Sequence, residues 1–321
     1  MKQRKATQRG IMVVGGTQVV AGSLNDWRSL VATFVADQDV KPSSRELYKR
    51  TLTQFFKWVE IAGKHLDTME RGDLLEYKDS LSSKGLSSLT IGSYIVVLRK
   101  FYGWTAAHGL YRNISEGLKA PRRVQAFKKQ HLTDSKSTEL LEHFRGIGLR
   151  DYAIVNLILR SGLRTIEVVR ADVSDVTFKG ERRILKVWGK GHNEKDDYIV
   201  LTDKAWEPIK NYLATRPNAR SNEPLFVSYS RQNAGQRLTT RTISGIVKDG
   251  LKAIGLDGRE FTAHSLRHTA AVAILKHGGS ITDVQEVLRH NSPTTSQIYV
   301  ESVKEELRLA KCPESLIDEA F

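Results

Sequence analysis

Three segments in the second half of the chain carry residues that could act on a phosphate: "SGLRTIEVV" with Arg164, "HSLRHTAAVAIL" with Arg267, and "VLRHNSPTTSQIY" with Tyr299. A phenol has a pKa of about 10, so its oxygen attacks phosphorus only where cations and hydrogen-bond donors stabilise the oxyanion or a base removes the proton. Breaking a phosphodiester also adds negative charge to the nonbridging oxygens, which the forked donors of paired arginines stabilise. We interpret Tyr299 as a candidate nucleophile and the two arginines as candidate electrostatic groups.

Carboxylate and imidazole side chains stand beside these arginines. Glu167 follows Arg164 by three residues, so the two share a helix face and the carboxylate could orient the guanidinium; an ordinary surface ion pair is the alternative. His264 and His268 have the i, i+4 spacing of zinc ligands, but Ser265 stands where a metalloprotease pattern has glutamate. Neither a cysteine nor a carboxylate nearby completes a ligand set, so we expect no metal site.

The first half of the chain shows helical periodicity over residues 23–108, in four segments separated by turn signals. Ser23, and Ser43 or Ser44, are candidate N-caps of the first two segments, and Gly63 is a candidate C-terminal stop. The fourth segment has apolar side chains at helical spacing, which predicts core packing rather than a platform for stacking bases. These side chains are Leu89, Tyr94, Val97, Leu98 and Phe101.

The second half mixes helical and strand patterns. Helices are predicted over about 135–145 and 150–170, and residues 182–201 alternate around Gly189 and Gly191 as a strand, a turn and a strand. Helical periodicity then resumes. A chain of 321 residues is long enough for two cores, so we predict a mainly α fold in two domains, with a small antiparallel β-sheet in the second.

The composition is strongly basic, with 50 Lys and Arg against 36 Asp and Glu, a net charge of +14 and an isoelectric point near 9.7. This balance indicates a polyanionic partner such as nucleic acid. Residues 1–130 contain 22 basic and 11 acidic side chains, whereas residues 131–321 contain 28 and 25. We therefore expect residues 1–130 to supply most of the electrostatic attraction to the polyanion.

No apolar stretch approaches the roughly 18 residues that span a bilayer, so we expect no membrane partner. Residues 1–22 begin like a signal peptide, but "GGTQ" at residues 15–18 interrupts the apolar run, and we interpret them as a basic arm. The single cysteine, Cys312, excludes an intrachain disulfide and favours a reducing cytoplasm, where a DNA-binding protein would associate with the nucleoid.

The order of the motifs carries a resemblance that no single motif does. "SGLRTIEVV", "WGKGHNEK", "HSLRHTAAVAIL" and "VLRHNSPTTSQIY" resemble, in order and spacing, the boxes of the tyrosine recombinase or phage integrase family. "SSRELYKRTLTQFFKW", "TIGSYIVVLRKFYGWTAAHGL" and "ISEGLKAPRR" are similar to the core-binding domain and linker of its Xer-like and mobile-element members. The resemblance covers about residues 23–308.

The resemblance implies a two-domain, C-shaped clamp around DNA. Its parts would be a basic N-terminal arm (1–22), a helical, SAM-like core-binding domain (23–116), a basic linker (117–132), a catalytic domain (133–310) and a C-terminal tail (311–321). If both domains hold DNA, cations of the linker would lie along its backbone and release counterions. These cations are Arg122, Arg123, Lys128 and Lys129.

The resemblance also implies roles for individual residues. Arg164 and Arg267 resemble the two catalytic arginines, His264 the histidine of the HxxR box, His290 the later histidine or tryptophan, Tyr299 the nucleophile, and Lys190 the lysine that protonates the leaving oxygen. The chain departs from the family in two places. Arg289 stands where the family often has glycine, and the turn reads "GKGHNEKDD" where the Xer pattern is "GKGNKER", which leaves Lys195 as a second candidate for the acid.

The expected function is site-specific DNA recombination for a mobile element, through a 3′-phosphotyrosyl intermediate and a Holliday junction, with neither cofactor nor catalytic metal. The family implies double-stranded recombination sites, a homo-tetramer on two duplexes and room for an accessory DNA-bending or directionality protein. DNA relaxation of the type IB topoisomerase kind and a catalytically silent DNA-binding regulator are the alternatives. The tail offers Leu316, Ile317 and Phe321 as apolar anchors for a neighbouring protomer.

Overall fold

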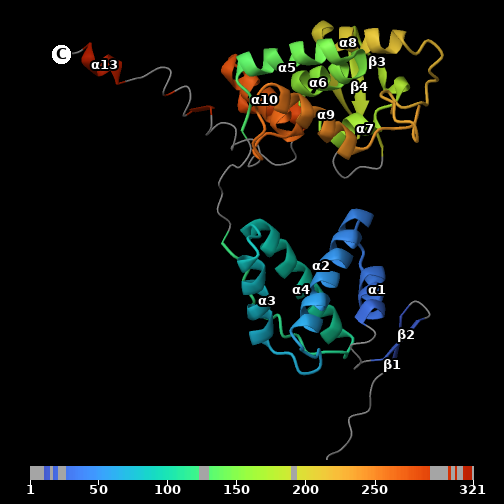
Figure 1. Ribbon diagram of the computed structural model, residues 1–321, viewed down its shortest axis with the longest axis vertical. Helices are drawn as coiled ribbons and strands as arrows, with labels where there is room; N and C mark the ends of the chain where they lie inside the picture. The colour runs from blue at the N-terminus through green and yellow to red at the C-terminus, as the bar shows by residue number, and fades with distance from the viewer. Residues whose placement is uncertain are drawn as a thin grey trace, which may run out of the picture. The chain divides into compact units, whose positions relative to one another are not determined.

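The computed structural model describes residues 11–14, 17–20, 27–122, 130–188, 194–289, 303–304, 308 and 314–319 (Figure 1). The chain divides into two compact units, Met1–Ala126 (unit 1) and Phe127–Phe321 (unit 2). The division falls inside the predicted linker, 117–132. Leu118 is buried in the core of unit 1 and Leu132 in that of unit 2, so each unit holds one end of that segment.

A β-hairpin occupies part of the segment interpreted as a basic arm. Strand β1 (Ile11–Val14) pairs antiparallel with β2 (Thr17–Val20), in a register that sets Val14 opposite Thr17. Two glycines, which in the sequence interrupt an apolar run, stand between the two strands. A separation of two residues is that of a two-residue hairpin connection. The β-branched residues on either side favour strands.

Unit 1 is helical beyond this hairpin, with elements α1 (Trp27–Asp37), α2 (Pro42–Ile61), α3 (Arg71–Ser83) and α4 (Ser88–Ala107). The prediction of Ser43 or Ser44 as an N-cap was wrong, because α2 begins at Pro42, whose fixed φ suits the first helical position. Gly63 follows α2 with φ +62°, as a helix stop. Ser23 lies outside the described residues.

Aromatic side chains fill the core of unit 1. Phe34 and Phe101 meet edge to face at 5.5 Å between ring centroids, and Phe55 and Tyr77 at 5.1 Å. Of the five side chains predicted for the core of α4, four are buried, so those aromatics are core residues rather than base-stacking platforms. Leu89 is 57% exposed; it lies in the first turn of the helix, where no neighbouring element covers it.

Unit 2 combines a small antiparallel sheet with helices. The sheet has the order β3 (Val176–Lys179), β4 (Arg182–Val187), β5 (Asp197–Val200), with Val187 opposite Asp197 at the end of the β4–β5 pair where the chain connects the two strands. The helices are α5 (Asp134–Ile147), α6 (Leu149–Ser161), α7 (Thr165–Arg170), α8 (Asp203–Ala214), α9 (Thr240–Ala253), α10 (Ala263–Lys276), α11 (Ile281–Leu288) and α13 (Ser315–Asp318). The fold is thus mainly α with a small antiparallel sheet, as predicted.

One helix predicted for unit 2 is two helices in the structure. The sequence predicts a single helix over 150–170, but α6 ends at Ser161 and α7 begins at Thr165. Gly162 caps α6 with φ +61°, a left-handed conformation that glycine adopts without steric cost. The break leaves Arg164 in extended backbone at the N-terminus of α7.

Helix α10 runs through the centre of unit 2. Its middle, from Ser265 to Val272, is buried, and it contacts α6, α9 and α11. Within the part of the chain that the structure describes, no helix is both long enough and apolar enough to cross a membrane.

Candidate active site

Arg164 is held at the start of α7 by Glu167. The carboxylate accepts the backbone N–H of Arg164 through Oε2 at 2.7 Å and its Nη1 through Oε1 at 2.8 Å. Glu167 is buried, whereas the Arg164 side chain is 30% exposed. The carboxylate of the ion pair therefore lies inside the protein, and part of the guanidinium is accessible to solvent. This geometry fits the predicted orienting role better than a free surface pair does.

Arg267 is buried in the middle of α10 with 1% of its surface exposed. Its Nη1 donates to the carbonyl of Gly162, and its Nη2 donates to the carbonyl of Leu288 at 2.5 Å. These acceptors are the residue that ends α6 and the last residue of α11. The guanidinium therefore joins α10 to the turn that carries Arg164 and to the end of α11.

The two histidines of α10 have different surroundings. His264 is exposed at the first turn of the helix, whereas His268 is buried and stacks on His131, with ring centroids 5.5 Å apart and planes at 10°. A zinc site would need both rings to face one ion. Among the described residues, no group of three His, Cys, Asp or Glu side chains could hold a metal.

A third arginine, Arg289, completes the polar cluster. Its Nη2 donates to Oε2 of Glu167 at 2.8 Å, so one buried carboxylate bridges Arg164 and Arg289. Sequence reasoning recorded Arg289 only as a departure from the family pattern. Its contact with Glu167 spans 122 residues, and no local pattern indicates a contact of that range.

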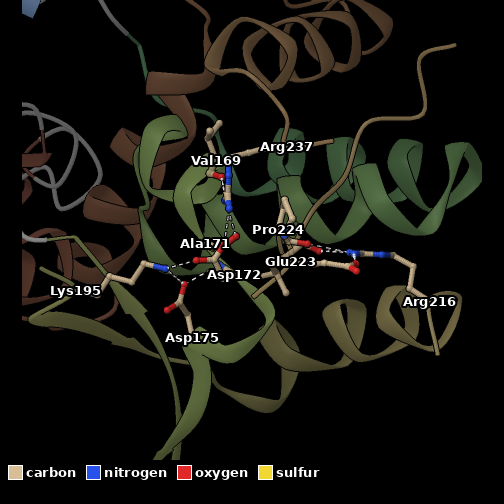
Figure 2. Close-up of polar contacts among 10 residues, drawn as sticks. Val169, Ala171, Asp172, Asp175, Lys195, Arg216, Glu223, Pro224 and Arg237 are labelled. Carbon is tan, nitrogen blue, oxygen red and sulfur yellow. Dashed lines mark hydrogen bonds and ion pairs between the residues drawn. The ribbon is translucent and has the colours of Figure 1, made fainter. Parts of the chain in front are cut away.

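Lys195, the second candidate for the general acid, is bound by the carboxylates of Asp172 and Asp175, which follow α7 in the sequence (Figure 2). Its Nζ lies 2.6 Å from Oδ2 of Asp172 and also donates to Oδ2 of Asp175. Burial of Lys195 disfavours its charge, but the hydrogen bonds to the two carboxylates outweigh burial and raise its pKa above the usual value. Lys195 is therefore a worse proton donor than an ordinary lysine.

Asp172 also fastens the segment after α7 to Arg237, which lies shortly before α9 in the sequence. Arg237 donates through Nη2 to Oδ1 of Asp172 at 2.5 Å and through Nη1 to the carbonyl of Val169 at 2.7 Å, as Figure 2 shows. Burial raises the pKa of Asp172, but hydrogen bonds from Lys195 and Arg237 outweigh it and hold the pKa below its usual value. Sequence reasoning missed this network, whose members lie 20 to 68 residues apart.

Of the remaining predicted site residues, one is among the described residues and the others are not. Arg122 is exposed after the last ordered turn of unit 1. Lys190, His290 and Tyr299, together with the linker cations Arg123, Lys128 and Lys129, lie outside the described residues. The structure thus pairs Arg164 with Glu167, bonds Arg267 to Gly162 and to Leu288, two residues before His290, and pairs Lys195 with Asp172 and Asp175.

Comparisons with known proteins identify the family and the fold of this chain. The model of the "Phage integrase family" matches residues 130–306, and that of the "Phage integrase, N-terminal SAM-like domain" matches residues 31–109. A tyrosine recombinase XerD of Xanthomonas axonopodis pv. citri is 28% identical over 288 residues, which cover 86% of this chain and 92% of that protein.

Solved structures with the same fold include two recombinase complexes. XerH bound to a palindromic difH substrate, in a post-cleavage complex, matches with a TM-score of 0.69 and 22% identity over 88% of this chain and 84% of that one. The Tn1549 transposon integrase with transposon right-end DNA matches with a TM-score of 0.66 and 18% identity over 88% and 99%. The family model covers more than half of the chain, and the chain belongs to the phage integrase family of tyrosine recombinases, the site-specific enzymes that cleave and rejoin DNA.

Proposed function

We propose that this enzyme exchanges strands at a defined recombination site through a 3′-phosphotyrosyl intermediate formed on Tyr299. The observation that carries the proposal is the bonding of Arg267 to the carbonyls of Gly162 and Leu288. It draws the Arg164 turn, α10 and the end of α11 together. His290 comes two residues after Leu288, and Tyr299 eleven residues after it. The proposed nucleophile thus follows shortly after a segment that is tied to both arginines.

In the proposed reaction, Tyr299 loses its phenolic proton to solvent, and its oxygen bonds to phosphorus as the bond from phosphorus to the 5′-oxygen breaks. Arg164, Arg267, His264 and His290 would donate hydrogen bonds to the nonbridging oxygens, whose negative charge grows in the transition state. The leaving 5′-oxygen takes a proton, and the free 5′-hydroxyl of a partner strand later reverses the step. One phosphodiester is exchanged for another ester of similar energy, so no nucleotide hydrolysis is required.

We assign the leaving-group proton to Lys190 rather than Lys195. Lys195 holds its proton between two carboxylates and has a raised pKa, and both effects oppose proton donation. Lys190 precedes it by five residues, in the turn between β4 and β5. The carboxylates of Asp172 and Asp175 hold Lys195 two residues before β5 begins.

Covalent trapping tests the proposal. The probe is a nicked suicide duplex that carries the recombination site, identified from the DNA that flanks the gene. Wild type should form a denaturant-resistant adduct at the 3′-phosphate, and Tyr299→Phe should form none while binding the same duplex with nearly equal affinity, since it loses one oxygen and no charge. The absence of an adduct with wild type would support the silent-regulator alternative. Relaxation of supercoiled DNA without that site would support the topoisomerase alternative.

We propose further that four protomers act on two duplexes, through a Holliday junction, and that the element served is mobile. The support is the fold shared with a transposon integrase bound to transposon-end DNA and with XerH on a palindromic site. A palindromic site presents two equivalent half-sites, so two protomers bind one duplex and synapsis of two duplexes needs four. An accessory DNA-bending or directionality protein is compatible with this scheme.

The C-terminal tail is the segment proposed to link protomers. Leu316 and Ile317 in α13 are 66% and 58% exposed, as expected of apolar side chains that await a partner surface. Deletion of residues 313–321 should leave binding to a single half-site intact but reduce cooperative binding and recombination, because the anchors are lost. The measurement is a gel-shift titration on one and two half-sites together with a recombination assay. Recombination by the truncated protein at the wild-type rate would contradict the proposal.

A further inference from the structure

Arg289 has a backbone conformation that its side chain disfavours. It caps α11 with φ +53° and ψ +54°, and among the described residues it is the one non-glycine residue with positive φ. In this left-handed region the Cβ atom crowds the following carbonyl oxygen, and glycine avoids the contact. The backbone alone would favour glycine here, so any benefit of arginine at this position comes from its side chain.

That side chain is buried among specific partners. Only 8% of it is exposed. Nη2 lies 2.8 Å from Oε2 of Glu167, Nη1 donates to the carbonyl of Val287 at 2.8 Å, and Nε lies 3.6 Å from Oδ2 of Asp197. A buried guanidinium is stable only when carboxylates and carbonyls compensate its lost hydration, so the cation and its two carboxylates stabilise one another.

Each partner belongs to a different part of the active site. Glu167 also binds the backbone and side chain of Arg164. Asp197 is the first residue of β5, at the end of the turn that carries Lys190. Leu288, next to Arg289, accepts a hydrogen bond from Arg267. One guanidinium therefore contacts the helix of the first arginine and the strand after the Lys190 turn, from a residue adjacent to His290.

We propose that Arg289 is a positioning residue that orients Arg164 through Glu167 and holds the β4–β5 hairpin against the end of α11. The proposal rests on the proposed function of Arg164 and Lys190. Without Arg289, Glu167 keeps its bonds to Arg164, but its Oε2 loses one of two donors and retains only the backbone N–H of Arg164. The carboxylate of Asp197, which is 33% exposed, loses its cation. Arg164 then samples orientations away from the phosphate.

The test compares cleavage with binding in Arg289→Gly, a change that suits the backbone. Adduct formation on the suicide duplex should slow by about 10- to 100-fold, the usual cost of losing an outer partner that orients a reactive group. The dissociation constant for the same duplex, measured in the Tyr299→Phe background, should change by less than about threefold, since Arg289 is buried and contacts protein groups. Arg289→Lys keeps the charge and should recover part of the rate.

A double-mutant cycle with Glu167→Gln separates positioning from a general loss of structure. If Arg289 acts through Glu167, adding Arg289→Gly to Glu167→Gln should slow cleavage little further. Equal slowing in both backgrounds would overturn the proposal, as would an Arg289→Gly enzyme that cleaves within threefold of wild type. If wild type itself forms no adduct, the proposed function fails and this inference fails with it. A wild-type adduct with an unaffected Arg289→Gly variant refutes the inference alone.

Discussion

Replacing Gly162 by alanine should disturb both the stability of unit 2 and the proposed active site. Gly162 caps α6 with φ +61°, and its carbonyl accepts a hydrogen bond from the buried Arg267. A Cβ atom at this position would lie 2.2 Å from Cδ2 of Leu288, which is fully buried, and 3.5 Å from Cβ of Ala270. The first distance is well inside van der Waals contact, so the buried Leu288 side chain, α11 or α6 must move.

Two costs add at this position. The left-handed backbone costs a residue with a Cβ atom about 1–2 kcal/mol. Overpacking a filled core costs about 1–3 kcal/mol more. The sum is roughly 2–5 kcal/mol, a large part of the stability of a domain, which is about 5–15 kcal/mol.

Gly180→Ala is the matched control. Gly180 has φ +57° in the turn between β3 and β4, and a Cβ atom there would have no heavy atom within 4 Å. It carries the backbone cost of about 1–2 kcal/mol without the clash. The difference between the two variants, about 1–3 kcal/mol, therefore isolates the contact with Leu288.

Hydrogen exchange read by mass spectrometry is the suitable assay, because the two units need not unfold together and exchange reports the opening of α10 and α11 separately. The adduct assay is run in parallel. Gly162→Ala should also slow cleavage, since the methyl group separates the two carbonyls that hold Arg267, whereas Gly180→Ala should cleave normally. Equal destabilisation by both variants, with normal cleavage by Gly162→Ala, would refute the reasoning.

Three further predictions follow from the site. Alanine at Arg164 or at Arg267 should slow adduct formation on the order of a hundredfold or more, because a preorganised charge donor is lost; a rate within a few-fold of wild type would exclude that arginine from the reaction. If Lys190 protonates the leaving oxygen, a substrate with sulfur at the bridging 5′ position should rescue Lys190→Ala, since a thiolate leaves without a proton; rescue of Lys195→Ala instead would assign the acid to Lys195. Asp172→Asn should destabilise unit 2 by about 1–3 kcal/mol at neutral pH, because the carboxylate accepts charge-assisted hydrogen bonds. The folded-state pKa of Asp172 is lowered, so this contribution is present above its ordinary value of 3.8 and is lost as the pH falls through the folded-state pKa. Urea unfolding at several pH values should show the two proteins converging in acid, and a constant gap would contradict the assignment.

Local patterns in the sequence were enough to predict much of the fold. Helix caps and 3.6-residue periodicity act over a few residues, so the helices of unit 1 and the hairpin of β4 and β5 were predictable. Predictions from these local patterns failed at two kinds of position: where no other element packs over an apolar side chain, and where a glycine ends a helix. Periodicity continues across Gly162, and only the left-handed turn ends α6 there; Leu89 fits the apolar pattern of α4 but has nothing packed over it.

Candidate reactive groups were named from the sequence, and the family comparison shows the class of reaction. Their partners were not predictable, because each contact joins segments that are distant in sequence. Arg267 reaches a carbonyl 105 residues away, and Arg289 reaches Glu167 across 122 residues. The pattern of the hairpin leaves two lysines as candidates for the acid. The carboxylates of Asp172 and Asp175, which only the fold brings to Lys195, support our proposal that Lys190 is the acid. The sequence by itself determined which residue types were present and which local elements they form, whereas tertiary packing decided which charges are compensated and therefore which remain available for chemistry.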